Sequence, residues 1–317
     1  LDTKWHQDIN KKNEDNILKD EMISLENTIT ESLQNFPEYK TFLIISACLG
    51  YQFNLKVLSD ATGLSLIETA KTIEDISIKT GIIENIPNAN NKIKFRNRST
   101  LLSLNSIFSL NETLDNIPLI QRTCCFNAAI AIKNYHKGYS NENERIFNLF
   151  EKSGTNNLTY TLDAGLNLSS NLCVLNQFDK ANIIIEKCLN YLKHYNSVNK
   201  NDLFNQLLIE KYFIELEKSF CNGTIIEKEY LSNIAEKWLE YSNYKNKLIY
   251  PIMRTLYNLR DYKGLKSFIE IVKKDNELDK WLVCDIEHYA ALIEIQFHKR
   301  LDKGKLLLSK CIKNLLY

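Results

Sequence analysis

The side chains that most often carry out catalysis or bind metal ions are scattered along this sequence. The histidines are His6, His136, His194, His288 and His298. None has a second His or Cys at the spacing of a strong metal motif, so ordinary surface or core histidines are favoured over zinc ligands. Acidic pairs such as Glu74-Asp75 fall on polar helix faces, and no Gly-x-Ser-x-Gly or His-Glu-x-x-His motif occurs. The sequence therefore predicts neither an enzyme nor a metal site.

Cysteine and phosphate-binding patterns lead to the same conclusion. The cysteines are Cys48, Cys124, Cys125, Cys173, Cys188, Cys221, Cys284 and Cys311. No Cys-x-x-Cys pair occurs, and most lie among apolar residues at helical spacing, so we interpret them as reduced core residues. A Gly-x-x-x-x-Gly-Lys-Ser/Thr loop is also absent, which means that these residues alone cannot cradle a triphosphate. We predict no cofactor.

One short segment could contact nucleic acid. Its basic residues are Lys92, Lys94, Arg96 and Arg98. The whole chain has 40 basic and 39 acidic side chains, so only such a local patch could attract phosphate. The helix expected from Ser65 to Lys79 offers Glu68, Lys71, Glu74, Asp75 and Lys79, a neutral to acidic face that repels phosphate. Nucleic acid is therefore the less favoured partner.

A second set of side chains suits a peptide or protein ligand. Its members lie on the first helices of two helical hairpins predicted below, and are Tyr250, Arg254, Tyr257, Asn258, Tyr289, Ile293, Gln296 and Phe297. Aromatic, amide and guanidinium groups together are typical of protein-binding surfaces. The alternative is that several of them pack between neighbouring repeats, and both interpretations are kept.

The elements that must position these residues are mainly helical, because 9 Gly and 4 Pro in 317 residues leave little material for tight turns. Residues 1–18 have no apolar period and are expected to be a linker. Met22 to Phe36 reads as an amphipathic helix ended by Pro37. The nearly continuous apolar run from Tyr39 to Leu49 predicts a buried helix that Gly50 closes.

The next segment has the order of a winged helix. A short helix at Leu55–Ala61 and a turn at 62–64 precede the Ser65–Lys79 helix, in which Ser65 and Glu68 form a capping box. Gly81 ends this helix. Residues 82–86 and 92–96 flank a turn-rich stretch, and we interpret them as a two-stranded wing.

From about Ile117 the pattern becomes pairs of long helices. The second helices are expected to begin near Asn141, Asp179, Ile225, Tyr262 and Asp302, a spacing typical of a helical-hairpin solenoid with five pairs. Repeats starting at Leu162 and Asp285 fit the tetratricopeptide consensus well, and one starting at Asn246 fits it less closely. Small residues at Ser169, Ala181 and Gly304 stand where paired helices must approach closely.

The predicted fold class is thus all-α, with a small winged-helix domain followed by a tetratricopeptide-like α-solenoid. We expect a linker at 1–18, the winged-helix domain with its preceding helix at 19–110, and the repeats at 111–317. No stretch approaches the roughly 20 apolar residues of a membrane span, so we expect a cytoplasmic location and no membrane partner. Because the sequence begins at Leu1, we expect a fragment or processed product of a larger protein.

Residues 39–110 resemble the winged-helix segment of signal-transduction ATPases with numerous domains. The resemblance lies in FLIISACLGYQFNLKVLSDATGLS, in TGIIE and in KIKFRNRSTLLSL. In that family, the segment links a nucleotide-binding core to a tetratricopeptide sensor region. The resemblance implies that an ATPase core precedes Leu1. The family commonly has a His after the Phe-Arg of the final strand, where this chain has Asn97, which places a nucleotide-sensing role of this segment in doubt.

Three functional hypotheses follow. The leading one is a non-catalytic sensor and regulatory fragment, whose repeats bind a peptide, protein or small ligand and whose winged helix couples this binding to the absent ATPase core. The second is a stand-alone transcription regulator that binds DNA through the winged helix and a signalling peptide through the repeats. The third is a plain repeat scaffold that holds a constitutive protein partner.

Overall fold

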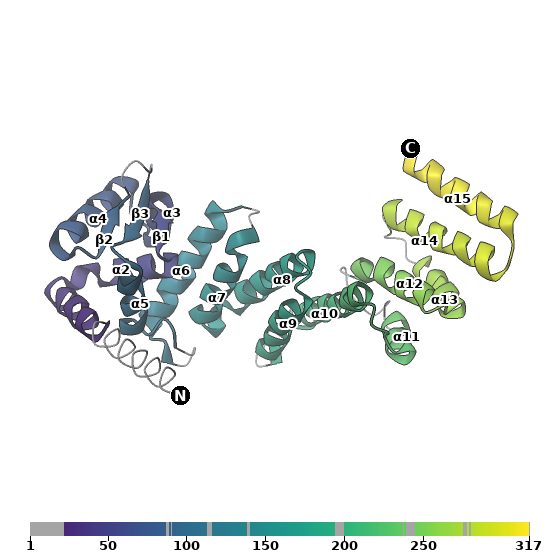
Figure 1. The fold of residues 1–317 in the computed structure, drawn as a ribbon, viewed down its shortest axis with the longest axis horizontal. Helices are drawn as coiled ribbons and strands as arrows, with labels where there is room; N and C mark the ends of the chain where they lie inside the picture. The colour runs from purple at the N-terminus through teal and green to yellow at the C-terminus, as the bar shows by residue number, and fades with distance from the viewer. Residues whose placement is uncertain are drawn as a thin grey trace, which may run out of the picture. The chain divides into compact units, whose positions relative to one another are not determined.

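The chain folds into two compact units, one up to Ala164 and one from Gly165 onward. The computed structural model describes residues 22–86, 89, 91–112, 116–137, 140–193, 200–236, 238, 245–274, 278 and 280–316. Helices dominate both units, and one small antiparallel sheet lies in the N-terminal unit (Figure 1). The predominantly helical class predicted from the sequence is therefore confirmed. The predicted linker at 1–18 lies outside the described residues.

The first described element of the N-terminal unit is a helix over 22–35, as predicted. Its further elements are η1 (Pro37–Tyr39), α2 (Lys40–Leu49), β1 (Gln52–Asn54), α3 (Leu55–Thr62), α4 (Leu66–Thr80), β2 (Ile83–Asn85), β3 (Lys92–Phe95), α5 (Arg98–Ile107), α6 (Leu119–Tyr135), η3 (Ser140–Glu142), α7 (Asn143–Ser153) and η4 (Thr155–Asn157). α8 (Leu158–Val174) contains the division between the units.

Helix α2 is buried along its length, as its continuous apolar sequence predicts. All residues from Phe42 to Leu49 are buried. The helix ends at Gly50, whose φ of 87° is in the region that only glycine adopts readily. A Cβ at Gly50 would also lie 2.5 Å from Nη2 of Arg145, which comes from α7. The backbone conformation therefore requires glycine at this position, whereas the flexible end of the Arg145 side chain could move away from a Cβ.

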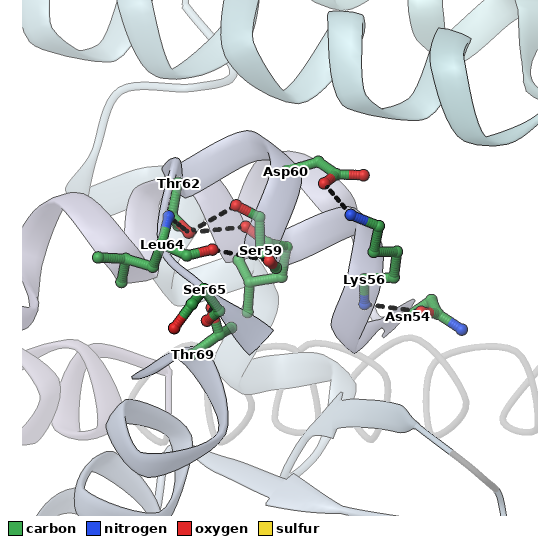
Figure 2. Close-up of polar contacts among 9 residues, drawn as sticks. Asn54, Lys56, Ser59, Asp60, Thr62, Leu64, Ser65 and Thr69 are labelled. Atoms are coloured by element: carbon green, nitrogen blue, oxygen red, sulfur yellow. Dashed lines mark hydrogen bonds and ion pairs between the residues drawn. The ribbon is translucent and has the colours of Figure 1, made fainter. Parts of the chain in front are cut away.

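The turn between α3 and α4 is held by short side chains (Figure 2). The Ser59 hydroxyl donates to the carbonyl of Leu64 at 2.7 Å. Ser65 Oγ accepts from the Glu68 amide at 3.2 Å, and the Ser65 amide donates to Glu68 Oε2 at 2.9 Å. The predicted capping box is thereby confirmed, and Gly63 and Gly81 end the two helices in the left-handed conformation.

The predicted two-stranded hairpin is present, but it belongs to a sheet of three strands. β2 pairs with β3 in antiparallel register, Ile83 opposite Phe95. β1 pairs with the other edge of β3, Phe53 opposite Ile93, so the order is β1-β3-β2. The sequence analysis missed β1, because three residues are too short to show an alternating pattern. Within β3, Ile93 and Phe95 are buried in the core.

Helix α5 follows the sheet and is capped by Asn97. Its Oδ1 accepts from the backbone amide and from the hydroxyl of Thr100, both at 2.8 Å. Helix α6 packs against α2 and α3, and α7 packs against α6. The sequence analysis placed a boundary at 110/111; these contacts join the first predicted helical pair to the preceding helices.

The C-terminal unit consists of helices packed in succession. They are α9 (Phe178–Lys193), α10 (Lys200–Asn222), α11 (Lys228–Glu236), η6 (Lys245–Leu248), α12 (Ile249–Asn258), α13 (Tyr262–Val272), α14 (Lys280–Leu292), the π-helical turn η7 (Ile293–Phe297) and α15 (Leu301–Leu316). Contacts join α9 to α10, α10 to α12, α12 to α13, and α14 to α15, the last pair lying side by side in Figure 1. Leu256, Leu265, Phe268 and Ile286 are among the buried residues of this core.

The predicted starts of the second helices agree with the structure to within three residues. Helices α7, α9, α11, α13 and α15 begin at Asn143, Phe178, Lys228, Tyr262 and Leu301. The predicted small residues are also buried, Ser169 and Ala181 completely. The sequence analysis did not foresee the π-helical turn η7.

Candidate functional site

Helix α12 separates its residues into a buried face and a face available for contact. Ile249, Ile252, Met253 and Leu256 recur at helical spacing and are at most 3% exposed. Pro251 and Thr255 are buried as well, and the remaining positions of the helix are exposed or half-buried. These remaining positions include the four residues of α12 that the sequence analysis selected: Tyr250, Arg254, Tyr257 and Asn258.

The selected aromatic residues form a connected cluster. The ring of Tyr289 on α14 lies 6.2 Å from that of Tyr250 and 5.8 Å from that of Tyr257, centroid to centroid, with edge-to-face geometry. Tyr262, which was not selected as a site residue, extends the cluster at 6.1 Å from Tyr257 and 5.5 Å from Phe297. Such contacts stabilise aromatic pairs beyond the area they bury. The structure thus brings the two predicted sets of residues together.

The exposure of these residues differs. Tyr250 is 41% and Phe297 47% exposed, and Gln296 and Asn258 are also exposed. Tyr289 is 7% exposed, and burial, followed by the neighbouring Tyr250, raises the pKa of its phenol, which stays protonated. The predicted Ile293 is buried in the core, where it packs rather than faces solvent.

Arg254 is held in place by neighbours on α10. Its Nη2 donates to Glu217 Oε1 at 2.8 Å, and its guanidinium carbon lies 3.7 Å from the ring centroid of Phe220. The same group lies 5.4 Å from the ring of Tyr250. Its side chain is 12% exposed. Arg254 therefore braces the aromatic cluster, and its Nε is buried without a hydrogen-bond partner.

A groove of about 430 Å³ opens beside Tyr250 and Tyr289. Its other lining residues are Trp281, Cys284, Asp285 and His288 of α14 and Cys311 of α15. Trp281 is 71% exposed, an unusual position for so large an apolar side chain. The sequence analysis missed it. The spacing 281, 284, 285, 288 is one helix face and would have revealed it.

Helix α15, which contributes Cys311 to this groove, packs closely at its beginning on the end of α14 and on η7. A Cβ at Gly304 would lie 2.3 Å from Cγ1 of Ile295 and 3.2 Å from the carbonyl oxygen of Ala291. The predicted close approach of paired helices at Gly304 is thereby confirmed. Glycine at this position therefore lets α15 lie close to the end of α14.

The candidate nucleic-acid residues lie in the N-terminal unit. Lys94 forms an ion pair with Glu84 across β2 and β3 at 2.7 Å, and the hydrogen bond to Glu84 raises the pKa of Lys94. Arg98 lies over the ring of Tyr51 at 5.8 Å. Lys92 and Arg96 are exposed. The hairpin thus presents less positive charge than its sequence suggests.

The expected DNA-contacting helix, α4, is not basic at its surface. Glu68, Lys71, Glu74, Asp75 and Lys79 are all exposed. Lys79 donates to the Tyr39 hydroxyl at 2.8 Å and lies against two aromatic rings. Ile67 and Ile78 are 70% and 76% exposed. Acidic and apolar side chains therefore separate the basic groups of this face.

Among the described residues, most histidines and cysteines lie apart from one another, but two pairs of cysteines are in contact. His136 lies in the N-terminal unit, whereas His288 and His298 lie in the C-terminal unit; His6 and His194 are outside the described residues. Among the residues that the structure describes, no three His, Cys, Asp or Glu side chains are grouped to hold a metal ion. The cysteines are free thiols and mostly buried, but Cys221 is exposed, contrary to its prediction as a core residue. Cys284 and Cys311 donate to each other's backbone carbonyl oxygens, at 3.6 and 3.4 Å, and the pair Cys48 and Cys125 is described below.

Comparison with protein-family models, with curated proteins and with solved structures finds no match to this chain. Over the described part of the chain, no helix has both the length and the apolar character to cross a membrane.

Proposed function

We propose that the C-terminal unit is a peptide- or protein-binding module of tetratricopeptide type, and that the chain acts without chemistry of its own. The observation that carries this proposal is the groove of about 430 Å³ beside the cluster formed by Tyr250, Tyr257 and Tyr289. Tyr and Trp supply large contact areas at low entropic cost, and such residues dominate the binding energy of many interfaces.

The groove favours a segment with an apolar or aromatic anchor. Tyr250 and the highly exposed Trp281 offer ring faces, while Asp285 and His288 supply polar groups at the same groove. The bracing of Tyr250 by Arg254 preorganises one wall, which lowers the entropic cost of binding. Tyr289 packs between helices and also lines the groove. The packing residues and the groove-facing residues therefore form a single candidate site.

In this proposal the N-terminal unit is a winged helix that couples binding to an ATPase core of the signal-transduction type. The support is the order of its elements and the resemblance of residues 39–110. A ligand would act by favouring one of two arrangements of the larger protein, to the extent of its differential affinity for them. Asn97, which the structure uses as the cap of α5, takes a structural role at the position where the family commonly has His.

The binding proposal can be tested with a phage-displayed library of random peptides selected on the whole chain. Enriched peptides are synthesised, and their affinity is measured for the chain and for Tyr250→Ala and Trp281→Ala. Loss of an anchor contact worth about 2 kcal/mol would weaken binding about 30-fold. Phe204→Ala, at another exposed aromatic residue of the same unit, is the matched control and should bind unchanged.

Tryptophan fluorescence gives an independent readout of where the peptide binds. Trp281 is 71% exposed and Trp238 is fully buried, so covering the groove should shift the emission of Trp281 to shorter wavelength. Trp281→Phe should abolish the shift. Peptides that bind Tyr250→Ala and Trp281→Ala as tightly as the original chain would refute this assignment of the site.

The coupling part makes a separate prediction. If the coupling proposal is right, the coding sequence upstream of Leu1 encodes a P-loop ATPase core in the same reading frame. If no such core is encoded there, the repeat-scaffold hypothesis is favoured. The DNA-binding alternative rests on the exposed Lys92 and Arg96. Since the positive charge of Lys94 is paired with Glu84, we expect no gel shift of random duplex DNA at low salt and micromolar protein. A shift there would favour the regulator instead.

A further inference from the structure

Two thiols of the N-terminal unit meet where α2 packs on α6. Sγ of Cys48, near the end of α2, lies 3.7 Å from Sγ of Cys125 on α6. A disulfide bond is about 2.05 Å long, so the two sulfurs would have to approach by about 1.7 Å. Side-chain rotation supplies movement of this size without separating the helices. The two cysteines are 77 positions apart in the sequence, so this is a long-range contact.

The thiol pair lies at a cavity. Cys48 and Cys125 both line a space of about 520 Å³, together with Arg145 and Lys152 of α7 and side-chain amides such as that of Asn148. Cys48 is 7% exposed and Cys125 is fully buried. A small polar molecule can therefore approach the pair through the cavity.

The surroundings favour ionisation of one sulfur. The hydrogen bond from the Cys48 thiol lowers the pKa of Cys125, and the positive charge of Lys152 adds to this, against the effect of burial. The same hydrogen bond, with burial, raises the pKa of Cys48. By contrast, burial raises the pKa of the neighbouring Cys124 to about 11. Thiolates are the nucleophilic form of cysteine, so the pair differs in reactivity from the residue next to it.

We propose that Cys48 and Cys125 form a reversible oxidation site that a peroxide converts into a disulfide between α2 and α6. The thiolate of one cysteine attacks a peroxide oxygen, the O–O bond breaks, and the departing oxygen leaves as water after taking up a proton. The resulting sulfenic acid is attacked by the second sulfur, which forms the S–S bond and releases a second water. One hydrogen peroxide and two thiols thus give one disulfide and two waters.

The disulfide would tie the helices before the sheet to the first helical pair. Arg145 already joins these parts, since it donates to the Cys48 carbonyl oxygen from Nη2 at 2.9 Å and from Nε at 3.2 Å. A covalent link at the same place would restrict any movement of α6 on α2. This inference does not depend on the proposed peptide groove, which lies in the other unit.

The test uses the whole chain with Cys221→Ser, because the exposed Cys221 would otherwise react first. Equimolar hydrogen peroxide is added, remaining thiols are alkylated, and tryptic peptides are identified by mass spectrometry. The expected product joins peptide 41–56 to peptide 123–133, with the loss of two thiols per chain. Dithiothreitol should restore both thiols, as expected for a disulfide but not for a sulfinic acid.

Peptide 123–133 contains Cys124 as well as Cys125, so a variant must separate them. Cys124→Ser should form the cross-link as before, whereas Cys125→Ser and Cys48→Ser should not. The parent chain is informative even if one variant does not fold. Modification of other cysteines without the 41–56 to 123–133 link, or a link that persists in Cys125→Ser and disappears in Cys124→Ser, would overturn the proposal.

Discussion

Substitution of Gly304 by alanine tests whether helix packing or helix propensity dominates at the beginning of α15. The new Cβ would lie 2.3 Å from Cγ1 and 2.8 Å from Cδ1 of Ile295, and 3.2 Å from the carbonyl oxygen of Ala291. Overpacking of this kind costs about 1–3 kcal/mol. Replacing a helical glycine by alanine contributes about 1 kcal/mol in the opposite direction.

The packing cost should be the larger of the two. Cγ1 is close to the Ile295 backbone and cannot move far, and the Ala291 oxygen belongs to the backbone itself. We therefore expect Gly304→Ala to lower the free energy of unfolding of the C-terminal unit by up to about 2 kcal/mol.

Urea unfolding followed by tryptophan fluorescence can measure this change. In a Trp5→Phe background, the remaining tryptophans, Trp238 and Trp281, both lie in the C-terminal unit. The urea concentration at the midpoint of unfolding should fall. The slope of the free energy of unfolding against urea concentration should stay constant.

A double-mutant cycle supplies the control. In an Ile295→Ala background the two clashing side-chain carbons are absent, so Gly304→Ala should become neutral or stabilising, by up to about 1 kcal/mol. If Gly304→Ala stabilises the protein even with Ile295 present, the helices have room for a methyl group and the packing argument is wrong.

Three further predictions concern buried or capping groups. Lys247→Ala leaves the almost fully buried Glu210 carboxylate without its ion-pair partner, and should lower the free energy of unfolding by about 3 kcal/mol in urea titration. Asn97→Ala removes the cap of α5 and should cost about 1 kcal/mol by the same assay, whereas Asn97→Asp should restore most of it. The hydrogen bonds from Ser65 lower the pKa of Glu68 in the folded protein. The contribution of Glu68 to capping is therefore present above the ordinary glutamate pKa and is lost as the pH falls below that value. Glu68→Gln should remove this part of the pH dependence of thermal unfolding.

The sequence was sufficient to place most helices, because their signals are local. Gly50 and Gly81 end helices, Ser65 and Glu68 begin one, and the apolar periods fix which face is buried. The close approach at Gly304 was also predictable, since the need for a small residue follows from the packing of paired helices. The elements that the sequence did not reveal are those set by their partners. β1 exists through its pairing with β3, and the π-helical turn at the end of α14 shows no local signature.

The candidate groove was predictable only in part, for a similar reason. Helical spacing placed Tyr250 and Tyr289 on the right helices, and the structure brings them together. Periodicity could not show that Arg254 forms an ion pair with Glu217 and lies over the ring of Phe220. These two residues lie on another helix, more than thirty positions earlier. The contact between Cys48 and Cys125 likewise depends on how α2 and α6 pack. Their spacing in the sequence does not predict it.

The packing of α6 on α2 and α3 determines how this protein can be divided for further work. A fragment that ends at residue 110 would lose α6 and α7, leaving the fully buried Leu43 and Ile44 of α2 without part of their cover, and it would lose the guanidinium that binds the end of α2. Such a fragment would tend to aggregate. The smallest piece suited to separate expression therefore extends through the first helical pair, α6 and α7, which ends at Ser153, even though the sequence pattern already changes near Ile117.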